Sequence, residues 1–249
     1  MSIVIAELIG TFLLVLLGNG VVANVLLTRS KGHSGGWISI TAGWGFAVAI
    51  AVYATGWISG GHFNPAVTLG FVISDITPLK LVPYYLMGQF AGAMLGALAV
   101  WLCYFPHWEK TESPQLKLLC FATDPAIRRT SWNLVTEIIG TAVLLVGVLA
   151  IFNEHNGISR GFGPYAVGIL VFSIGLSLGG PTGYAINPAR DLGPRIMYSL
   201  LPIQGKGSAD WRYAWVPVIG PLIGSILGTL LYKWCIENMP ALKALVMID

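Results

Sequence analysis

Two asparagines, each followed by proline and alanine, are the residues of this 249-residue chain best suited to contact an uncharged polar solute. The two tripeptides are Asn64-Pro65-Ala66 and Asn187-Pro188-Ala189. Asparagine is a strong helix N-cap and proline suits the first helical turn, so each tripeptide predicts the abrupt start of a helix. Because the side-chain oxygen accepts the capping bond, we expect the amide NH₂ of each asparagine to be free to donate to a water or hydroxyl oxygen.

A short glycine-bearing stretch precedes each asparagine, with the sequence GGHF at 60–63 and GYAI at 183–186. Non-helical backbone at membrane depth is tolerated only where it is buried or lines a watery cavity. We therefore expect these stretches to present a ladder of carbonyl acceptors to a solute. The predicted ladder residues are Gly60, Gly61, His62, Phe63, Gly183, Ala185 and Ile186. His62 has an alternative interpretation as a packed loop histidine, but we favour an exposed carbonyl with the ring hydrogen-bonded aside.

Two carboxylates, Glu7 and Glu137, lie inside apolar runs. A carboxylate within a membrane span is costly unless it finds partners. The expected partners are the free backbone N–H groups of the two glycine-bearing stretches, with one glutamate serving each. A proton relay is the alternative, but a relay needs neighbouring His or Asp residues along the span.

The composition identifies the surroundings of these residues as lipid. Apolar residues make up 55% of the chain, charged residues only 10%, and the mean hydropathy is +0.73. A soluble domain carries about 25% charged residues, and disorder requires low hydrophobicity, so both classes are excluded. The three cysteines show neither disulfide nor metal-ligand spacing. The net charge of +3 has no basic cluster behind it, which argues against nucleic acid as a partner. We expect no metal and no cofactor.

Six apolar stretches are long enough to cross a lipid core about 30 Å thick, which requires about 20 helical residues. These stretches are 3–27, 37–59, 81–104, 133–152, 161–181 and 214–236. The segments after Asn64 and Asn187 are apolar but too short to cross, so they predict two half-helices. Short, Gly/Pro-interrupted segments at matching places in two halves indicate a transport site.

The two halves of the chain resemble each other. The sequence AELIGT at 6–11 corresponds to TEIIGT at 136–141, and glycines recur at four-residue spacing in the third and sixth spans. These glycines are Gly88, Gly92, Gly96, Gly220, Gly224 and Gly228. Such spacing favours close helix contact. Because each half has three spans, the second must be inverted. We expect one all-α membrane domain over 1–249, with inverted repeats at about 3–104 and 133–236, a connecting loop at 105–132, and half-helix N-termini meeting near the midplane.

With these paired motifs and repeated halves, the chain resembles the major intrinsic protein family, the aquaporins and glycerol facilitators, from Ile3 to about Ile236. Four residues match positions typical of the glycerol-conducting branch: Tyr104, Asp191, Arg195 and Pro217. The resemblance implies the aquaporin-like fold and a homotetramer with one pore per subunit in the cell membrane. It also implies that both termini are cytoplasmic, whereas the charges of the loops predict the opposite orientation.

The resemblance further implies a selectivity ring of four residues: Trp44, Gly175, Tyr184 and Arg190. At 1.5 Å per residue, Trp44 and Gly175 lie about 10 Å and 9 Å from the same membrane face, which is consistent with one ring. Gly175 should widen the ring, since water-selective relatives typically carry histidine there. Tyr184 departs from the phenylalanine usual in glycerol facilitators. Taken alone, Trp44 has an alternative interpretation as an interfacial tryptophan.

These features predict a passive channel that conducts glycerol and other small uncharged solutes together with water. Protons and ions should be excluded by the positive helix N-termini and the paired asparagine donors. A water-selective channel, or one for undissociated lactic acid, urea or peroxide, is the alternative. A membrane enzyme or proton-coupled transporter is a third class, but the sequence has no nucleophile–base pair, metal cluster or phosphate loop, so we predict that the chain is not an enzyme.

Overall fold

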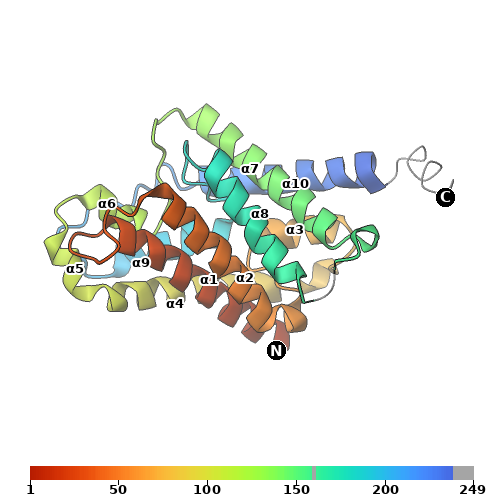
Figure 1. The fold of residues 1–249 in the computed structure, drawn as a ribbon, viewed down its shortest axis with the longest axis horizontal. Coiled ribbons are helices and arrows are strands. Elements are labelled where there is room, and N and C mark those ends of the chain that lie inside the picture. Colours follow the sequence, from red (N-terminus) through yellow and green to blue (C-terminus); the bar gives the residue numbers. More distant parts are fainter. Residues whose placement is uncertain (159–160, 238–249) are drawn as a thin grey trace.

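The computed structural model describes residues 1–158 and 161–237, so the last residues of the domain predicted over 1–249 lie outside the described part. Within it the chain is helical (Figure 1). The elements are α1 (Ser2–Leu26), α2 (Gly36–Ser59), α3 (Pro65–Ile73), η1 (Leu79–Leu81), α4 (Val82–Cys103), α5 (Phe105–Lys110), α6 (Pro114–Leu119), α7 (Thr130–Ile151), η2 (Glu154–Asn156), α8 (Gly163–Leu178), α9 (Pro188–Leu200), α10 (Val216–Leu231) and η3 (Tyr232–Glu237).

Among the described residues, five helices are long and apolar enough to cross a membrane: α1, α2, α4 with η1, α7, and α10 with the start of η3. The remaining predicted span, 161–181, is shorter than expected, because α8 has 16 residues and ends at Leu178. The sequence Gly179-Gly180-Pro181 follows, and glycine and proline favour helix termination. The predicted connecting loop, 105–132, contains the two short helices α5 and α6.

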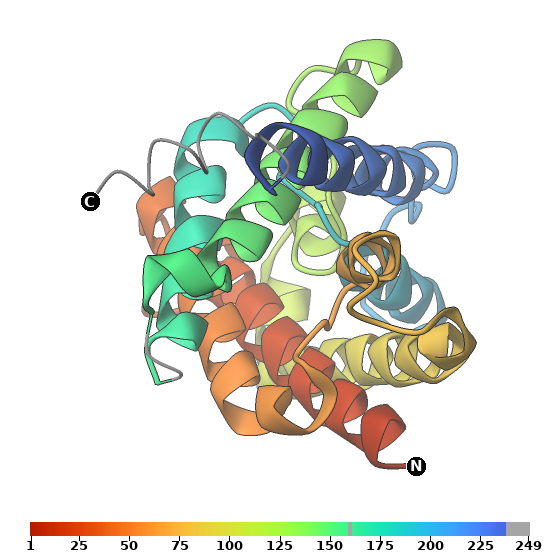
Figure 2. The same cartoon turned by 90° about the vertical axis from the view of Figure 1, so that its right-hand side faces the viewer.

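Helix contacts in the first half of the chain have counterparts in the second. Helix α1 packs on α4 and α2, just as α7 packs on α10 and α8, and α2 packs against α8. The short helix α9 lies on α4, and α3 lies on α10. Figure 2 shows α3, in orange, between the blue α10 and the yellow α4. Each short helix therefore lies against a long helix of the opposite half.

The predicted glycine contacts are confirmed. A Cβ atom at Gly88 would lie 2.5 Å from the backbone oxygen of Val4 in α1, and one at Gly228 would lie 2.5 Å from the backbone oxygen of Ala142 in α7. Real Cβ atoms do not approach backbone so closely, because the repulsion must be relieved by moving a helix. Glycine is therefore required where α4 crosses α1 and where α10 crosses α7.

Gly228→Ala should lower the midpoint of thermal unfolding, because overpacking of this kind costs about 1–3 kcal/mol. The measurement is tryptophan fluorescence of the purified protein in detergent during heating. Gly20→Ala in α1 is the matched control, since no atom of the described residues lies within 4 Å of a Cβ atom there. A Gly228→Ala protein that unfolds at the wild-type temperature would contradict the close contact of α7 and α10.

Candidate functional site

Helices α3 and α9 begin at the two asparagines. The Asn64 side-chain oxygen accepts from the backbone N–H of Ala66 at 2.8 Å. The Asn187 side-chain oxygen accepts from Ala189 at 3.0 Å and from Arg190 at 3.2 Å. Pro65 and Pro188 are the first helical residues. An N–H at this position has no partner within the helix, so proline loses no hydrogen bond there. Both helix starts therefore follow from local sequence.

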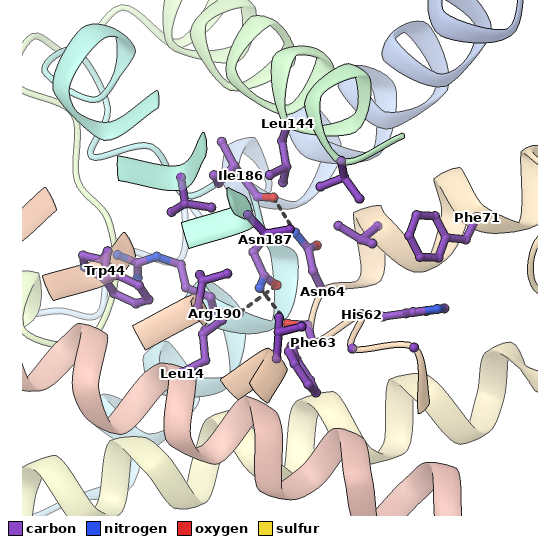
Figure 3. Close-up of a pocket in the computed structure, with 18 of the residues that line it drawn as sticks. Leu14, Trp44, His62, Phe63, Asn64, Phe71, Leu144, Ile186, Asn187 and Arg190 are labelled. Atoms are coloured by element: carbon purple, nitrogen blue, oxygen red, sulfur yellow. Dashed lines mark hydrogen bonds between the residues drawn. The ribbon is translucent and has the colours of Figure 1, made fainter. Parts of the chain in front are cut away.

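The two helix starts face each other and are cross-linked by the asparagine side chains (Figure 3). The Asn64 amide nitrogen donates to the backbone oxygen of Ile186 at 2.8 Å, and the Asn187 amide nitrogen donates to that of Phe63 at 2.8 Å. Each pairing joins residues more than a hundred positions apart. The positive ends of two helix dipoles therefore converge in the interior of the protein.

These cross-links correct the expectation that both asparagine NH₂ groups are free. An NH₂ group has two hydrogens, and the opposite loop takes one from each asparagine. One donor per asparagine is left for a solute. The carbonyls of Phe63 and Ile186, which were predicted to belong to the acceptor ladder, already accept these bonds. These two carbonyls therefore hold the two loops together. Each carbonyl oxygen has one further lone pair that could accept a hydrogen bond from a solute.

The loops before the two asparagines share a backbone conformation. A positive φ occurs one, three and four residues before each asparagine: Phe63 (50°), Gly61 (69°), Gly60 (89°), Ile186 (43°), Tyr184 (40°) and Gly183 (81°). Left-handed backbone at a non-glycine residue costs about 1–3 kcal/mol and persists only where surrounding contacts impose it. Tyr184 occupies the position at which the first loop has Gly61, so its conformation needs external support.

Buried Glu7 holds the first loop through its backbone N–H groups. The Glu7 carboxylate accepts from His62 N at 3.1 Å and from Phe63 N at 2.7 Å. The Ser59 hydroxyl and the Gln89 amide add bonds of 2.6 Å and 2.8 Å. Four donors compensate this carboxylate for the loss of water.

Glu137 acts on the second loop in the same way. Its carboxylate accepts from Ala185 N at 3.0 Å and from Ile186 N at 2.8 Å. The partners of both glutamates are therefore backbone N–H groups of the two glycine-bearing stretches, 60–63 and 183–186. Because N–H and C=O point in opposite directions across a trans peptide, the carbonyls of Gly61, His62, Tyr184 and Ala185 face away from the glutamates.

A cavity of about 80 Å³ lies beside the cross-linked asparagines. Part of its lining comes from the two loops and the residues that follow them: Gly60, Gly61, His62, Phe63, Asn64, Tyr184, Ala185, Ile186, Asn187 and Arg190. The rest of the lining is apolar apart from the indole nitrogen of Trp44: Leu14, Trp44, Val48, Val52, Val67, Phe71, Leu144, Val148, Phe152, Val167 and Val171. The cavity wall thus combines hydrogen-bonding groups with hydrocarbon.

Several predicted site residues do not line this cavity. Gly183 lies beside Thr123, and Gly175 lies behind Tyr184. Pro65, Ala66, Pro188 and Ala189 are buried in the first turns of their helices. The His62 ring also points away from the asparagines (Figure 3): it stacks on Tyr85 at 4.0 Å and contacts the Thr68 hydroxyl at 3.1 Å.

Trp44, Tyr184 and Arg190 meet at one end of the cavity. The Arg190 guanidinium lies over the Trp44 ring, 4.1 Å from its centre (Figure 3). Trp44 is only 4% exposed, so it is not an interfacial tryptophan. Within the described part of the chain, the Trp44 indole nitrogen, the Tyr184 hydroxyl and one Arg190 terminal nitrogen are buried without a hydrogen-bond partner. Buried polar atoms normally have partners, so this cluster is suited to a polar ligand.

The space beside Gly175 is filled, which corrects the expectation that this glycine widens a ring. A Cβ atom at Gly175 would lie 2.8 Å from the Tyr184 ring and 2.8 Å from the Thr41 methyl group. A Cβ atom at Gly179 would also lie 2.5 Å from the Tyr184 ring. The two glycines therefore form a seat for Tyr184. Packing in this seat supports the left-handed backbone of Tyr184.

The comparisons with known proteins agree with this geometry. A family model described as "Major intrinsic protein" matches residues 1–232. The chain belongs to the major intrinsic protein family. It is 58% identical over 234 residues to the "Probable glycerol uptake facilitator protein" of Thermotoga maritima, covering 94% of this chain and 99% of the relative. It is 52% identical over 233 residues to the "Glycerol uptake facilitator protein" of Streptococcus pneumoniae R6, covering 94% and 99%.

Among solved structures, the X-ray structure of the aquaglyceroporin from Plasmodium falciparum superposes with a TM-score of 0.86. The sequences are 30% identical, and the match covers 98% of both chains. This member of the major intrinsic protein family is therefore a multi-pass membrane channel with the aquaporin-like fold, and not an enzyme.

Trp37 is a site residue of this major intrinsic protein that sequence reasoning missed. Its indole nitrogen donates to the backbone oxygen of Gly175 at 2.9 Å, and its ring meets that of Tyr184 edge-on at 5.8 Å. At the start of a span, a tryptophan is typical of the membrane interface, so its position indicated no further role. Gln89, which bonds Glu7, was missed because one glutamine in an apolar helix has no distinctive spacing.

Proposed function

We propose that this channel conducts glycerol and other small uncharged solutes, together with water, passively across the cell membrane. The observation that carries the proposal is the mixed lining of the cavity, which combines backbone carbonyls and amide donors with hydrocarbon. A polyol carries both hydroxyls and carbon atoms, so it matches both kinds of lining. The names of the Thermotoga and Streptococcus relatives support glycerol as the solute.

Trp44, Tyr184 and Arg190 form the proposed selectivity filter, and Gly175 provides the seat that positions Tyr184. The unpaired nitrogen of Arg190 and the Trp44 indole N–H are donors for solute hydroxyl oxygens. The Trp44 and Tyr184 rings contact the carbon backbone of the solute. A solute that offers both kinds of contact replaces its hydration there, whereas a purely apolar molecule leaves the polar groups unpaired.

Beyond the filter, the solute exchanges hydration for backbone carbonyls. The proposed acceptors are those whose peptide N–H is held by Glu7 or Glu137, namely the carbonyls of Gly61, His62, Tyr184 and Ala185. Gly60, which also lines the cavity, extends the ladder. The aliphatic and phenyl side chains of the lining form no hydrogen bonds, so beyond the filter hydroxyls orient toward the ladder.

Ion exclusion follows from the positive potential of the same cavity. Each helix N-terminus contributes about half a positive charge, and Arg190 adds a full one. The one remaining amide hydrogen on each of Asn64 and Asn187 presents a donor to the water at the midpoint. That water must offer its oxygen to the asparagines, which interrupts the donor–acceptor chain a proton would follow.

For the assembly, we propose a homotetramer of subunits that each contain two inverted repeats, about 3–104 and 133–236. The corresponding helix contacts of the two halves support the repeats. Large exposed aromatic side chains on the long helices, such as Trp57 and Phe46 of α2 and Trp132 of α7, are available to lipid or a neighbouring subunit. Native mass spectrometry from detergent micelles tests the tetramer.

Stopped-flow light scattering on proteoliposomes tests the proposed function. We expect rapid glycerol re-swelling that is linear in the gradient, unsaturated and unaffected by pH, together with fast water flux. Fast shrinkage without polyol re-swelling would establish the water-selective alternative instead. Saturation or pH coupling would indicate a transporter. A panel with lactic acid, urea and hydrogen peroxide tests the remaining solutes, with empty liposomes as the control.

Tyr184→Phe should raise glycerol flux about threefold and leave water flux nearly unchanged, since selectivity depends on pore width. The hydroxyl has no partner in the described part of the chain, so its removal should not destabilise the fold. The hydroxyl lies in the seat beside Gly175, so without it the ring can move further into the seat and away from the cavity. Tyr165→Phe, at a half-exposed tyrosine of α8, is the control. A lower glycerol flux in the phenylalanine variant would show that the hydroxyl binds solute rather than narrowing the ring.

A further inference from the structure

A buried ion pair lies directly behind the proposed filter. Asp191 follows Arg190 in the chain, and its carboxylate accepts from the Arg195 guanidinium at 2.8 Å and 3.1 Å. Both side chains are completely buried. Arg195 also donates to the backbone oxygen of Ala209 at 2.7 Å. A buried pair with these additional bonds is held in one geometry, because breaking any part leaves an uncompensated charge.

The connecting segment between the two halves completes this network through Thr123. The backbone N–H and the hydroxyl of Thr123 both donate to one carboxylate oxygen of Asp191, each at 2.7 Å. The backbone oxygen of Thr123 accepts from Arg195 at 2.8 Å. Thr123 is buried, and these three bonds attach residues outside both half-helices to the first turns of α9.

The other face of Thr123 lies against the second loop. A Cβ atom at Gly183 would lie 3.3 Å from the Thr123 methyl group, so the methyl packs directly on the Gly183 backbone. Gly183 has a φ of 81° and precedes Tyr184. Close by, the N–H of Ala126 donates to the backbone oxygen of Pro181 at 3.0 Å. The connecting segment therefore supports the stretch that leads into the filter.

We propose that Thr123 is a positioning residue for solute selection. Its hydroxyl holds Asp191 and thereby the adjacent Arg190, while its methyl group holds Gly183 and thereby Tyr184. The inference rests on the proposed function, because it assigns Arg190 and Tyr184 to the filter. Glycerol must contact several filter groups at once, whereas water needs one or two. A shift of the filter residues therefore affects glycerol more than water.

Thr123→Val, which keeps a methyl and removes the hydroxyl, should lower the ratio of glycerol to water flux about threefold, less than the full effect of a lost hydrogen bond to a charged group, because the Thr123 backbone N–H keeps its bond to the same Asp191 oxygen. Thr123→Ser keeps the hydroxyl and should restore most of that ratio. Thr111→Val is the matched control, since Thr111 is a buried threonine of the same segment whose hydroxyl donates to His107 instead. Fluxes are measured by stopped-flow scattering on reconstituted protein and divided by the amount of channel per liposome.

A wild-type ratio in Thr123→Val would overturn the inference, as would a parallel loss of both fluxes, because a purely structural defect scales them together. If the valine variant does not fold, Thr123→Ala, which adds no bulk, takes its place. A wild-type protein that conducts water but no glycerol would refute the proposed function instead. In that case proton leak tests the positioning separately: Thr123→Val should raise it, because a displaced Arg190 no longer repels cations at the filter. An unchanged leak would overturn the positioning of Arg190.

Discussion

Replacing Gly175 with histidine is expected to cut glycerol flux about tenfold or more while preserving most of the water flux, since pore width and lining groups set selectivity. The seat beside Gly175 has no room for a side chain, because even a Cβ atom would lie 2.8 Å from the Tyr184 ring. The imidazole must therefore displace Tyr184 toward the cavity. The filter becomes narrower and more polar, which a polyol tolerates less than water does.

The measurement is glycerol re-swelling and water shrinkage of proteoliposomes that contain equal amounts of channel. Gly180→His is the matched control, because in the part of the chain that the structure describes no atom lies within 4 Å of a Cβ atom at that glycine. It should leave both fluxes near their wild-type values. An equal loss of glycerol and water flux in Gly175→His would contradict the assignment of Gly175 and Tyr184 to the filter.

Arg190→Val is expected to open the channel to cations, with the leak of protons or sodium rising about tenfold or more, because each 1.4 kcal/mol removed from the barrier gives a factor of ten. The Arg190 charge lies in a buried cavity, where its repulsion of a cation is stronger than in bulk water. Valine removes both this charge and the donors that contact solute hydroxyls. Glycerol flux should therefore fall while ion leak rises.

Proton leak is measured with a pH-sensitive dye inside the liposomes, under an imposed potential. Arg190→Lys is the control that separates charge from shape, because lysine keeps the charge but lacks the planar set of donors. The lysine variant should remain tight to ions and still conduct glycerol poorly. An ion leak in Arg190→Val that equals the wild-type leak would exclude Arg190 as part of the barrier.

The sequence by itself determined the features that depend on local signals. An Asn-Pro pair is sufficient to start a helix, so α3 and α9 begin where the sequence predicts. The length of each apolar run located the long helices, because lipid thickness sets that length. The glycine spacing predicted that the third and sixth spans make close helix contacts, because a four-residue repeat lies on one helix face. The structure shows that their partners are α1 and α7.

Only the tertiary structure decided which side chains from distant segments contact one another. The hydrogen bond from the Asn64 side-chain amide to the Ile186 backbone oxygen uses an amide hydrogen for which the capping pattern predicted no partner within the protein. Whether Gly175 leaves a gap depends on where Tyr184 lies, and Trp37, far away in the chain, is among the residues that contact the Tyr184 ring. Thr123 reaches Asp191 from the connecting segment in the same way. Hydrogen bonding and packing change over fractions of an ångström, and spacing along a chain does not encode such distances between segments.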